Sequence, residues 1–282
     1  MRRGLAAATL MVAAAAVACD GGSGPELVLN GSPPATPYSG RLDIPAKEAD
    51  VSTPQALRTA SGAAGRALEC DGEIYWGTGP DGWSEDDGGD SPEDGLRLFF
   101  DMFDPEVPRG GYRVERREAD RVLYSYDVGG RTKVAVVVAK DQRDRPGWGP
   151  ETNASCDPAE LPASVTSGPG RHEIWTDASG RRVPVTKITS YSGAEHCGWQ
   201  SAHFLTLGEK TYVRDPHGVF AGDSVLDGRY DGDIAMPADA HDTGYRLRHW
   251  RLWLTDDGGT AYVRTSQGVE AWPKERRAFA CA

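Results

Sequence analysis

The sequence predicts an α+β fold, with antiparallel sheets, one or two short helices and two similar-sized halves, after a flexible N-terminal tether. Apolar and polar residues alternate over many short stretches, which is the period of half-buried strands. Gly-Gly and Asp-Gly pairs between these stretches are typical of hairpin turns. Two stretches, after Ser91 and after Gly193, read instead as short helices. Runs of strands with few helices favour antiparallel sheets over a parallel α/β fold.

The first 18 residues have the order of an export signal. Two arginines follow the first methionine, residues 5–18 are small and apolar, and Cys19 comes next. This order is typical of a secretory signal, and a cysteine at the cleavage site is typical of a bacterial lipoprotein. We therefore expect removal of residues 1–18 and attachment of a diacylglycerol to the Cys19 sulfur. Two acyl chains anchor a protein stably, whereas one binds a bilayer only marginally.

Two other interpretations of this N-terminus stay open. Ala16 and Ala18 also fit the cleavage site of an ordinary secretion signal, and Ala16 stands where lipoprotein signals usually carry Leu. A retained transmembrane helix needs about 20 apolar residues, and this run is shorter. The cysteine count favours the lipid, because an exported chain with five cysteines leaves one unpaired. Lipidation of Cys19 accounts for it.

The remainder of the chain divides by composition. Residues 19–67 are rich in Gly, Ser, Pro, Ala and charge with little apolar periodicity, which predicts a flexible tether. Residues 68–162 predict an α+β domain made of a helix and an antiparallel meander. Pro, Ser and Gly cluster at 162–170 as a linker, and residues 171–282 predict a β-rich α+β domain.

Four cysteines remain after lipidation: Cys70, Cys156, Cys197 and Cys281. In an oxidising compartment they predict two disulfides, for which three pairings are possible. We expect Cys70–Cys156 and Cys197–Cys281, because each bond would staple one half. Metal ligation or a redox pair is the alternative, but no Cys-x-x-Cys motif is present.

The first half begins with a strand at 73–76 and a glycine- and acid-rich loop at 77–90. Ser91 and Pro92 then suit the cap and first position of a helix to residue 103. Its apolar residues recur at helical spacing: Leu96, Phe99, Phe100 and Phe103. Beyond 110 the period changes to two, and strands at 112–114, 122–128 and 133–139 form the meander. A further strand is expected at 148–156.

The second half alternates strands with glycine turns. Residues 172–175 and 183–189 predict one hairpin, 204–207 and 210–214 a second, and 251–255 with 260–265 a third. Residues 268–272 add a last strand. Residues 195–204 predict a short helix that carries Cys197.

Four stretches of the folded part resemble a known group of proteins: 112–116, 122–128, 156–160 and 195–201. They read Tyr-Arg-Val-Glu-Arg, Val-Leu-Tyr-Ser-Tyr-Asp-Val, Cys-Asp-Pro-Ala-Glu and Glu-His-Cys-Gly-Trp-Gln-Ser. Through them the chain is similar to uncharacterised lipoproteins of actinomycetes. The resemblance implies an exported, membrane-anchored protein and carries no activity.

Charge excludes some partners. The formal net charge is −11, which argues against nucleic acid and against direct binding to anionic lipid headgroups. We expect membrane attachment through the N-terminal lipid, and a protein or glycan of the cell envelope as the possible partner.

Three groups of residues could act as catalytic groups or metal ligands. Glu195, His196 and Cys197 lie close to His203, but on a helix the two histidines would be two turns apart, too far to share a metal ion. Two acidic groups could offer oxygen ligands to calcium, although neither has EF-hand spacing. They are Asp227, Asp231 and Asp233, and Asp86, Asp87 and Asp90.

The eight tryptophans could stack on sugars if exposed, although strand tryptophans more often fill a core. No nucleophile elbow, phosphate loop, dinucleotide fingerprint or zinc-protease motif is present. The sequence therefore predicts no catalytic residue, no metal and no cofactor. It favours a binding or envelope-assembly module, with a cell-wall-directed hydrolase as the alternative.

Overall fold

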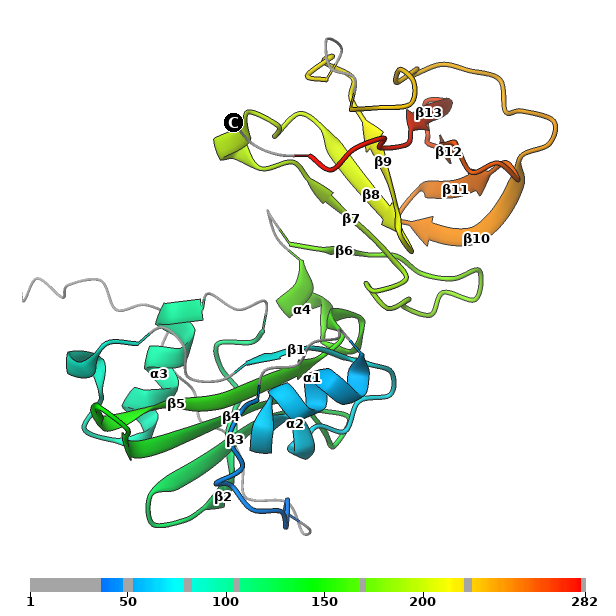
Figure 1. Cartoon of the computed structure of the whole chain (residues 1–282). Coiled ribbons are helices and arrows are strands. Elements are labelled where there is room, and N and C mark those ends of the chain that lie inside the picture. Colours follow the sequence, from blue (N-terminus) through cyan, green and yellow to red (C-terminus); the bar gives the residue numbers. More distant parts are fainter. Residues whose placement is uncertain are drawn as a thin grey trace, which may run out of the picture.

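The computed structural model describes residues 37–47, 53–78, 83–103, 107–167, 171–220 and 225–279. Within them it has three antiparallel sheets and four short α-helices (Figure 1), so the predicted α+β class is confirmed. The signal 1–18, Cys19 and Cys281 lie outside the described residues.

One five-stranded sheet organises the first half, which we call the N-terminal body (residues 37–162). Its strand order is β1-β5-β4-β3-β2 and all neighbours are antiparallel. The strands are β1 (Ile74–Thr78), β2 (Arg113–Arg117), β3 (Arg121–Val128), β4 (Arg131–Gln142) and β5 (Arg145–Cys156). The expected meander is therefore confirmed. Gly129 and Gly130 turn the chain between β3 and β4 with φ values of 60° and 78°, which other residues rarely adopt.

Helices cover both faces of this sheet (Figure 1). Helix α3 (Pro92–Phe103) packs on one face, and helices α1 (Pro54–Ala60) and α2 (Gly62–Ala67) pack on the other. Alternate residues of β4 face opposite sides of the sheet. Val134, Val136 and Val138 contact the α3 side, whereas Ala135 and Val137 contact the α2 side. Burial on both faces explains why residues 134–139 of β4 are an uninterrupted apolar run.

Helix α3 begins where the sequence predicts. The Asp94 backbone N–H donates to the Ser91 hydroxyl (3.2 Å), and the Asp94 carboxylate accepts from the Ser91 backbone N–H (3.1 Å). This reciprocal pair satisfies two backbone donors that the first turn leaves without partners.

The predicted tether is wrong for residues 54–67, which form α1 and α2. Residues before them also pack on the body, since Leu42 is fully buried and Ile44 accepts a hydrogen bond from the Ala63 N–H (3.0 Å). Ala63 and Ala64 are fully buried. Small residues allow the helix to approach the sheet closely, so this face needs no stripe of large apolar side chains.

The second half, the C-terminal body (residues 171–279), contains two four-stranded sheets with orders β6-β7-β8-β9 and β10-β11-β12-β13. The first has β6 (Glu173–Ile174), β7 (Ile188–Ser192), β8 (His203–Leu207) and β9 (Lys210–Arg214). The second has β10 (His241–Leu247), β11 (Trp250–Leu254), β12 (Thr260–Arg264) and β13 (Val269–Pro273). Hairpins β8–β9 and β11–β12 confirm the prediction, and β10 is additional.

The helix expected at 195–204 is wrong. Only the 3-10 turn η3 (Glu195–Cys197) forms, and Gly198 ends it in the left-handed conformation with φ 72°. The chain then runs into β8, which begins at His203.

The two sheets of the C-terminal body enclose an aromatic core. Trp175, Leu205 and Tyr212 come from the first sheet and its flank, and Val263 and Trp272 come from the second. The Tyr212 hydroxyl donates to the Gly258 carbonyl across the sheets (3.0 Å). The sheets also meet where Thr176, just after β6, exchanges two backbone hydrogen bonds of 2.8 Å with Arg246 of β10.

Short helices link the remaining segments. The 3-10 turn η1 (Glu85–Asp87) precedes α3, and η2 (Pro158–Glu160) and α4 (Ala163–Thr166) connect the two bodies.

The Cys70–Cys156 disulfide is present and ties the segment before β1 to the end of β5, as predicted. Cys197 is also disulfide-bonded. The two cysteines left as its possible partners, Cys19 and Cys281, lie outside the described residues, so the Cys197–Cys281 pairing stays a prediction.

Candidate functional site

The two bodies are joined through a buried carboxylate. Asp157, at the end of β5, is fully buried, and its Oδ1 accepts hydrogen bonds from the N–H groups of Ala159 (2.8 Å) and Val185 (3.1 Å). Burial raises the pKa of Asp157, although these backbone donors oppose the rise. Because Val185 belongs to the C-terminal body, the carboxylate fixes one body against the other.

Arg182 crosses the same junction in the opposite direction. Its guanidinium donates to the Leu161 carbonyl, to the Thr166 hydroxyl (2.9 Å) and to the Pro158 carbonyl (3.3 Å). Burial lowers the pKa of the guanidinium, and the nearby Asp157 opposes this. All three acceptors are neutral, and the nearby carboxylate of Asp157 is the negative charge that acts on Arg182.

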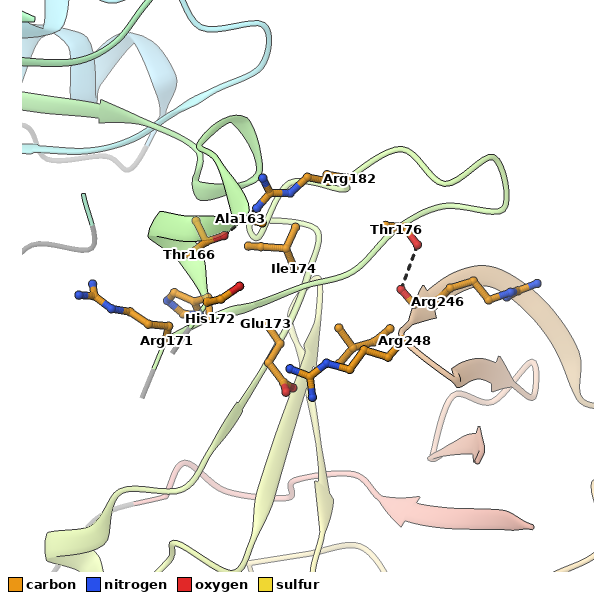
Figure 2. Close-up of a pocket in the computed structure, with 12 residues that line it drawn as sticks. Ala163, Thr166, Arg171, His172, Glu173, Ile174, Thr176, Arg182, Arg246 and Arg248 are labelled. Carbon is orange, nitrogen blue, oxygen red and sulfur yellow. Dashed lines mark hydrogen bonds between the residues drawn. The ribbon is translucent and has the colours of Figure 1, made fainter. Parts of the chain in front are cut away.

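A pocket of about 300 Å³ opens beside this junction. Its walls are α4, the segment that leads into β6, and the turn between β10 and β11 (Figure 2). Four arginines line it, together with one imidazole and one carboxylate among the described residues. They are Arg171, Arg182, Arg246, Arg248, His172 and Glu173.

Three of these arginines have no ion pair within the described part of the chain. Arg246 is held by Asp242 through two hydrogen bonds of 2.7 and 2.8 Å. Arg182 donates only to the neutral acceptors given above, and its charge interacts with that of Asp157. Arg171 has neither ion pair nor hydrogen bond to any described residue, whereas the charge of Arg248 acts on Glu173 and helps to lower the pKa of that carboxyl. Figure 2 shows the Arg248 guanidinium beside the Glu173 carboxylate, with Arg171 and Arg246 extending to opposite sides.

The turn that carries Arg248 has an unusual backbone. Leu247 pairs with Trp250, which leaves two residues to reverse the chain. Arg248 has φ 53°, in the left-handed region that non-glycine residues seldom adopt. The turn projects an exposed guanidinium into the rim of the pocket.

His172 connects the pocket to the N-terminal body. Its Nε2 lies 2.9 Å from the hydroxyl of Tyr75 in β1, and its Nδ1 lies 3.1 Å from the Thr189 hydroxyl in β7. Both ring nitrogens therefore have protein partners, so the imidazole positions the wall and is not free to act as a base.

Beneath the pocket, Glu173 belongs to a buried polar cluster. Its Oε2 accepts from the Ser190 hydroxyl (2.6 Å) and from His203 Nε2 (2.7 Å), and Ser190 in turn accepts from Trp175 Nε1 (3.0 Å). Burial alone would raise the pKa of Glu173, but the bonds from His203 and Ser190 outweigh it and hold the pKa below its usual value.

This cluster contains a serine, a histidine and a carboxylate but lacks the order of a nucleophilic triad. The serine hydroxyl donates to the carboxylate, whereas a catalytic serine must face the imidazole that takes its proton. Ser190 is also fully buried. The arrangement holds β6, β7 and β8 together and offers no exposed nucleophile.

The sequence-predicted chemical residues are not brought together. His203 bonds to Glu173, whereas His196 is exposed on η3. Asp227 is occupied by Lys274 (3.3 Å) and Arg276 (2.8 Å). Across the described ranges, the one set of three closely placed donor atoms is Cys70, Cys156 and Glu160, whose cysteines are already joined as a disulfide. Neither acidic group places three such donor atoms together among these residues.

Four of the eight tryptophans are buried. Trp175 and Trp272 are fully buried, Trp83 and Trp148 nearly so, and the other four are half-buried. The expectation that strand tryptophans fill a core is confirmed for Trp148 of β5 and Trp272 of β13, whereas Trp253 of β11 is half-buried.

A second pocket of about 350 Å³ lies beside β9 and includes two carboxylates, Asp215 and Asp227. Asp215 accepts from the N–H groups of Val219 (2.8 Å) and Phe220 (2.9 Å), and Asp227 is ion-paired as above. Neither of these two pockets presents a pair of free carboxylates, which a hydrolase of glycosidic bonds requires.

The chain matches no protein-family model, no curated protein and no solved structure. No helix in the described part is both long and apolar enough to cross a bilayer.

Sequence analysis missed the arginine-lined pocket. Its arginines are spread over residues 171–248 without a fixed spacing, and each looks like an ordinary surface charge in the sequence. Only the pairing of Thr176 with Arg246 and the turn at Arg248 bring them to one place.

Proposed function

We propose that this protein is an extracytoplasmic lipoprotein, anchored to the cell membrane through Cys19, whose folded part serves as a binding or assembly module of the cell envelope. The observation that carries the proposal is the cysteine at the end of an export signal in a chain with an odd number of cysteines. The Cys70–Cys156 disulfide supports the same compartment, because such bonds persist in oxidising spaces.

The module is proposed to bind and not to catalyse. The cluster of Glu173, Ser190 and His203 lacks an exposed nucleophile, and the carboxylates of the second pocket are engaged in structural bonds. The pocket at the junction is lined by four arginines, and charged side chains of this kind suit recognition of a polar ligand. The envelope partner is a protein or glycan that this module would hold near the membrane.

The test is membrane fractionation of a Cys19→Ser variant, with Ser23→Ala as the matched control. Loss of the sulfur removes the diacylglycerol site, so the variant should leave the membrane fraction while the control stays. Intact mass before and after reduction should show a diacylglyceryl increment on Cys19 and two disulfides. A Cys19→Ser protein that stays in the membrane fraction like the wild type contradicts the anchor.

A further inference from the structure

We propose that the outer face of the sheet β10–β13 binds an acidic glycan, one whose sugar rings carry carboxylates. The proposal rests on the binding role of the module and names its partner class, but it does not depend on the lipid anchor. The residues that carry it lie on two neighbouring strands, β11 and β12: Arg251, Trp253, Tyr262 and Arg264.

Two aromatic rings lie on the face of this sheet that is turned away from the core. Leu252 and Val263, which pair directly across β11 and β12, pack in the aromatic core of the C-terminal body. Successive side chains of a strand point to opposite faces. Trp253 and Tyr262 follow and precede these residues and also pair directly with each other, so they share the outer face. Neither ring belongs to an apolar cluster of the described residues.

Two arginines oppose each other beside these rings. Arg251 and Arg264 are a direct cross-strand pair, and both are exposed. Like charges at such positions repel, because the Cβ atoms are only about 4.5–5.5 Å apart. Neither arginine forms an ion pair or hydrogen bond with a described residue.

The acid beside this pair is already engaged. Asp242 of β10 accepts hydrogen bonds of 2.7 and 2.8 Å from Arg246, and Arg251 acts on it only through its charge. Arg246 and Arg251 thus share one carboxylate, and Arg264 has none among the described residues. In a chain with a net charge of −11, this face is a local exception that suits a carboxylate supplied by a ligand.

Arg264 is held in place by a ring. Its guanidinium carbon lies 5.2 Å from the centroid of the Trp253 ring, within the range of cation–π attraction. The contact orders the guanidinium without using its N–H groups, so little further freedom is lost when an acceptor arrives. A guanidinium prepared in this way can grip a carboxylate with two parallel hydrogen bonds.

Tyr262 supplies the ring that is left open. It is half-buried, it has neither a ring contact nor a cation contact among the described residues, and its hydroxyl has no hydrogen bond to them. An aromatic ring has an apolar face, and the tyrosine hydroxyl adds a polar tip. A sugar has the matching surfaces, because its C–H groups form a flat apolar face and its hydroxyls lie around the edge.

The size and composition of the face favour a glycan over a protein. A stable protein interface buries at least about 1,000 Å² and has an apolar centre. Here the apolar side chains beside the two rings are only Val269 and Ala271 of β13, which pair with Arg264 and Tyr262. Neighbouring strands are about 4.8 Å apart, so a pair of rings on adjacent strands offers a platform for roughly two sugars.

The test titrates the full-length mature protein, in a neutral detergent, with two tetrasaccharides by calorimetry. Tetragalacturonate carries a carboxylate on each sugar, and cellotetraose carries none. Arg264→Gln is compared with Arg143→Gln, which removes the same charge from an exposed arginine between β4 and β5. Tyr262→Thr removes the ring, whereas Tyr262→Phe keeps it. Thermal unfolding checks that each variant is folded, and the exposed Arg264 keeps the test decisive if Tyr262→Thr does not fold.

We expect tetragalacturonate to bind the wild type and Tyr262→Phe at least about tenfold more tightly than cellotetraose does. Arg264→Gln should weaken tetragalacturonate at least about tenfold, which is about 1.4 kcal/mol. Tyr262→Thr should weaken it at least about threefold, and Arg143→Gln should change it less than about twofold.

Three results overturn the proposal. Equal losses in Arg264→Gln and Arg143→Gln reduce the effect to general electrostatics. Equal affinity for cellotetraose removes the acidic assignment, and absence of binding by either sugar removes the site.

A last arm separates a glycan from a second copy of this chain. If sedimentation velocity shows that the wild type self-associates and that Arg264→Gln dissociates it, the face is a subunit interface and the glycan proposal is overturned. None of these outcomes changes the fractionation of Cys19→Ser, so the anchor and the glycan site are judged separately.

Discussion

The two bodies of the molecule bury their strands in different ways. In the N-terminal body, β4 and β5 each run for 12 residues, and helices cover the sheet from both sides. In the C-terminal body, no described strand exceeds the 7 residues of β10, and two small sheets face each other around an aromatic core. In the first arrangement most of the backbone belongs to long buried strands, whereas the second places many turns at the surface.

This difference explains where the pocket is found. A long strand buried on both faces must carry apolar residues throughout, as 134–138 of β4 do. Short strands with frequent turns can present charged side chains without exposing the core, as Arg171 and Arg248 are presented. The N-terminal body thus has the longer buried strands, and the junction with its neighbour carries the charged side chains that line the pocket.

The largest expected effect tests the scaffold. The double variant Cys70→Ala/Cys156→Ala opens a loop of 86 residues and should lower the free energy of unfolding by about 4 kcal/mol, because the unfolded chain gains freedom. Urea denaturation followed by tryptophan fluorescence measures it.

The matched comparison is Cys197→Ala/Cys281→Ala, which should destabilise the C-terminal body and leave the unfolding of the N-terminal body in place. If both double variants unfold in one shared transition with equal losses, the two bodies are not separate units of stability.

An intermediate effect tests the junction. Asp157→Ala leaves the N–H groups of Ala159 and Val185 without their acceptor and should cost about 1–3 kcal/mol. Asp157→Asn keeps an acceptor oxygen and should cost less. The measurement is differential scanning calorimetry, in which Asp157→Ala should lower the unfolding temperature more than Asp157→Asn does.

The pH dependence of stability gives a second test of Asp157. Burial raises the pKa of Asp157, so the folded state binds its proton more tightly than the unfolded state does. Its contribution to stability is therefore complete below the unfolded pKa of about 3.9 and declines as pH rises through the raised folded value. Asp157→Asn should remove this decline, and an unchanged pH profile would contradict a buried titrating carboxyl.

The smallest effect compares one hydroxyl in each body. Ser91→Ala removes the cap of α3 and should cost about 1 kcal/mol. Ser179→Ala removes a hydroxyl that bonds Asp177 in an exposed turn of the C-terminal body and should cost less than about 0.5 kcal/mol. Chemical denaturation of both variants tests whether a local hydrogen bond contributes more to the free energy of unfolding in the N-terminal body than in the C-terminal body.

Local signals were enough to predict much of the fold. The cap at Ser91 and the turn at Gly129 and Gly130 act through neighbouring backbone, so they are readable in a single sequence. The hairpins β8–β9 and β11–β12 were predicted for the same reason.

Elements that depend on distant partners were not predictable. Helix α2 lacks an apolar stripe, because Ala63 and Ala64 are stabilised by close approach to the sheet. Strand β10 contains Gly244 and polar residues, and it is held by β11 and by Thr176. Residues 195–204 have helical composition, but Gly198 ends the turn.

The features of the candidate site also divide into those with a local signal in the sequence and those that depend on distant partners. The Cys70–Cys156 bond was predicted from its position in one half, whereas Cys19 and its signal lie outside the described residues and stay a prediction. The pocket arises from the meeting of α4, β6 and the turn after β10. No periodicity marks Arg182 as an arginine that reaches neutral carbonyls, because its acceptors lie about twenty residues earlier in the chain.

The left-handed conformation of Arg248 places a guanidinium at the pocket rim at a cost in backbone strain. An L-residue other than Gly, Asn or Asp costs roughly 1–2 kcal/mol in this region, so Asn at this position would relax the hairpin. Selection for heat resistance alone should therefore replace Arg248. The more stable variants would lack the guanidinium at the pocket rim.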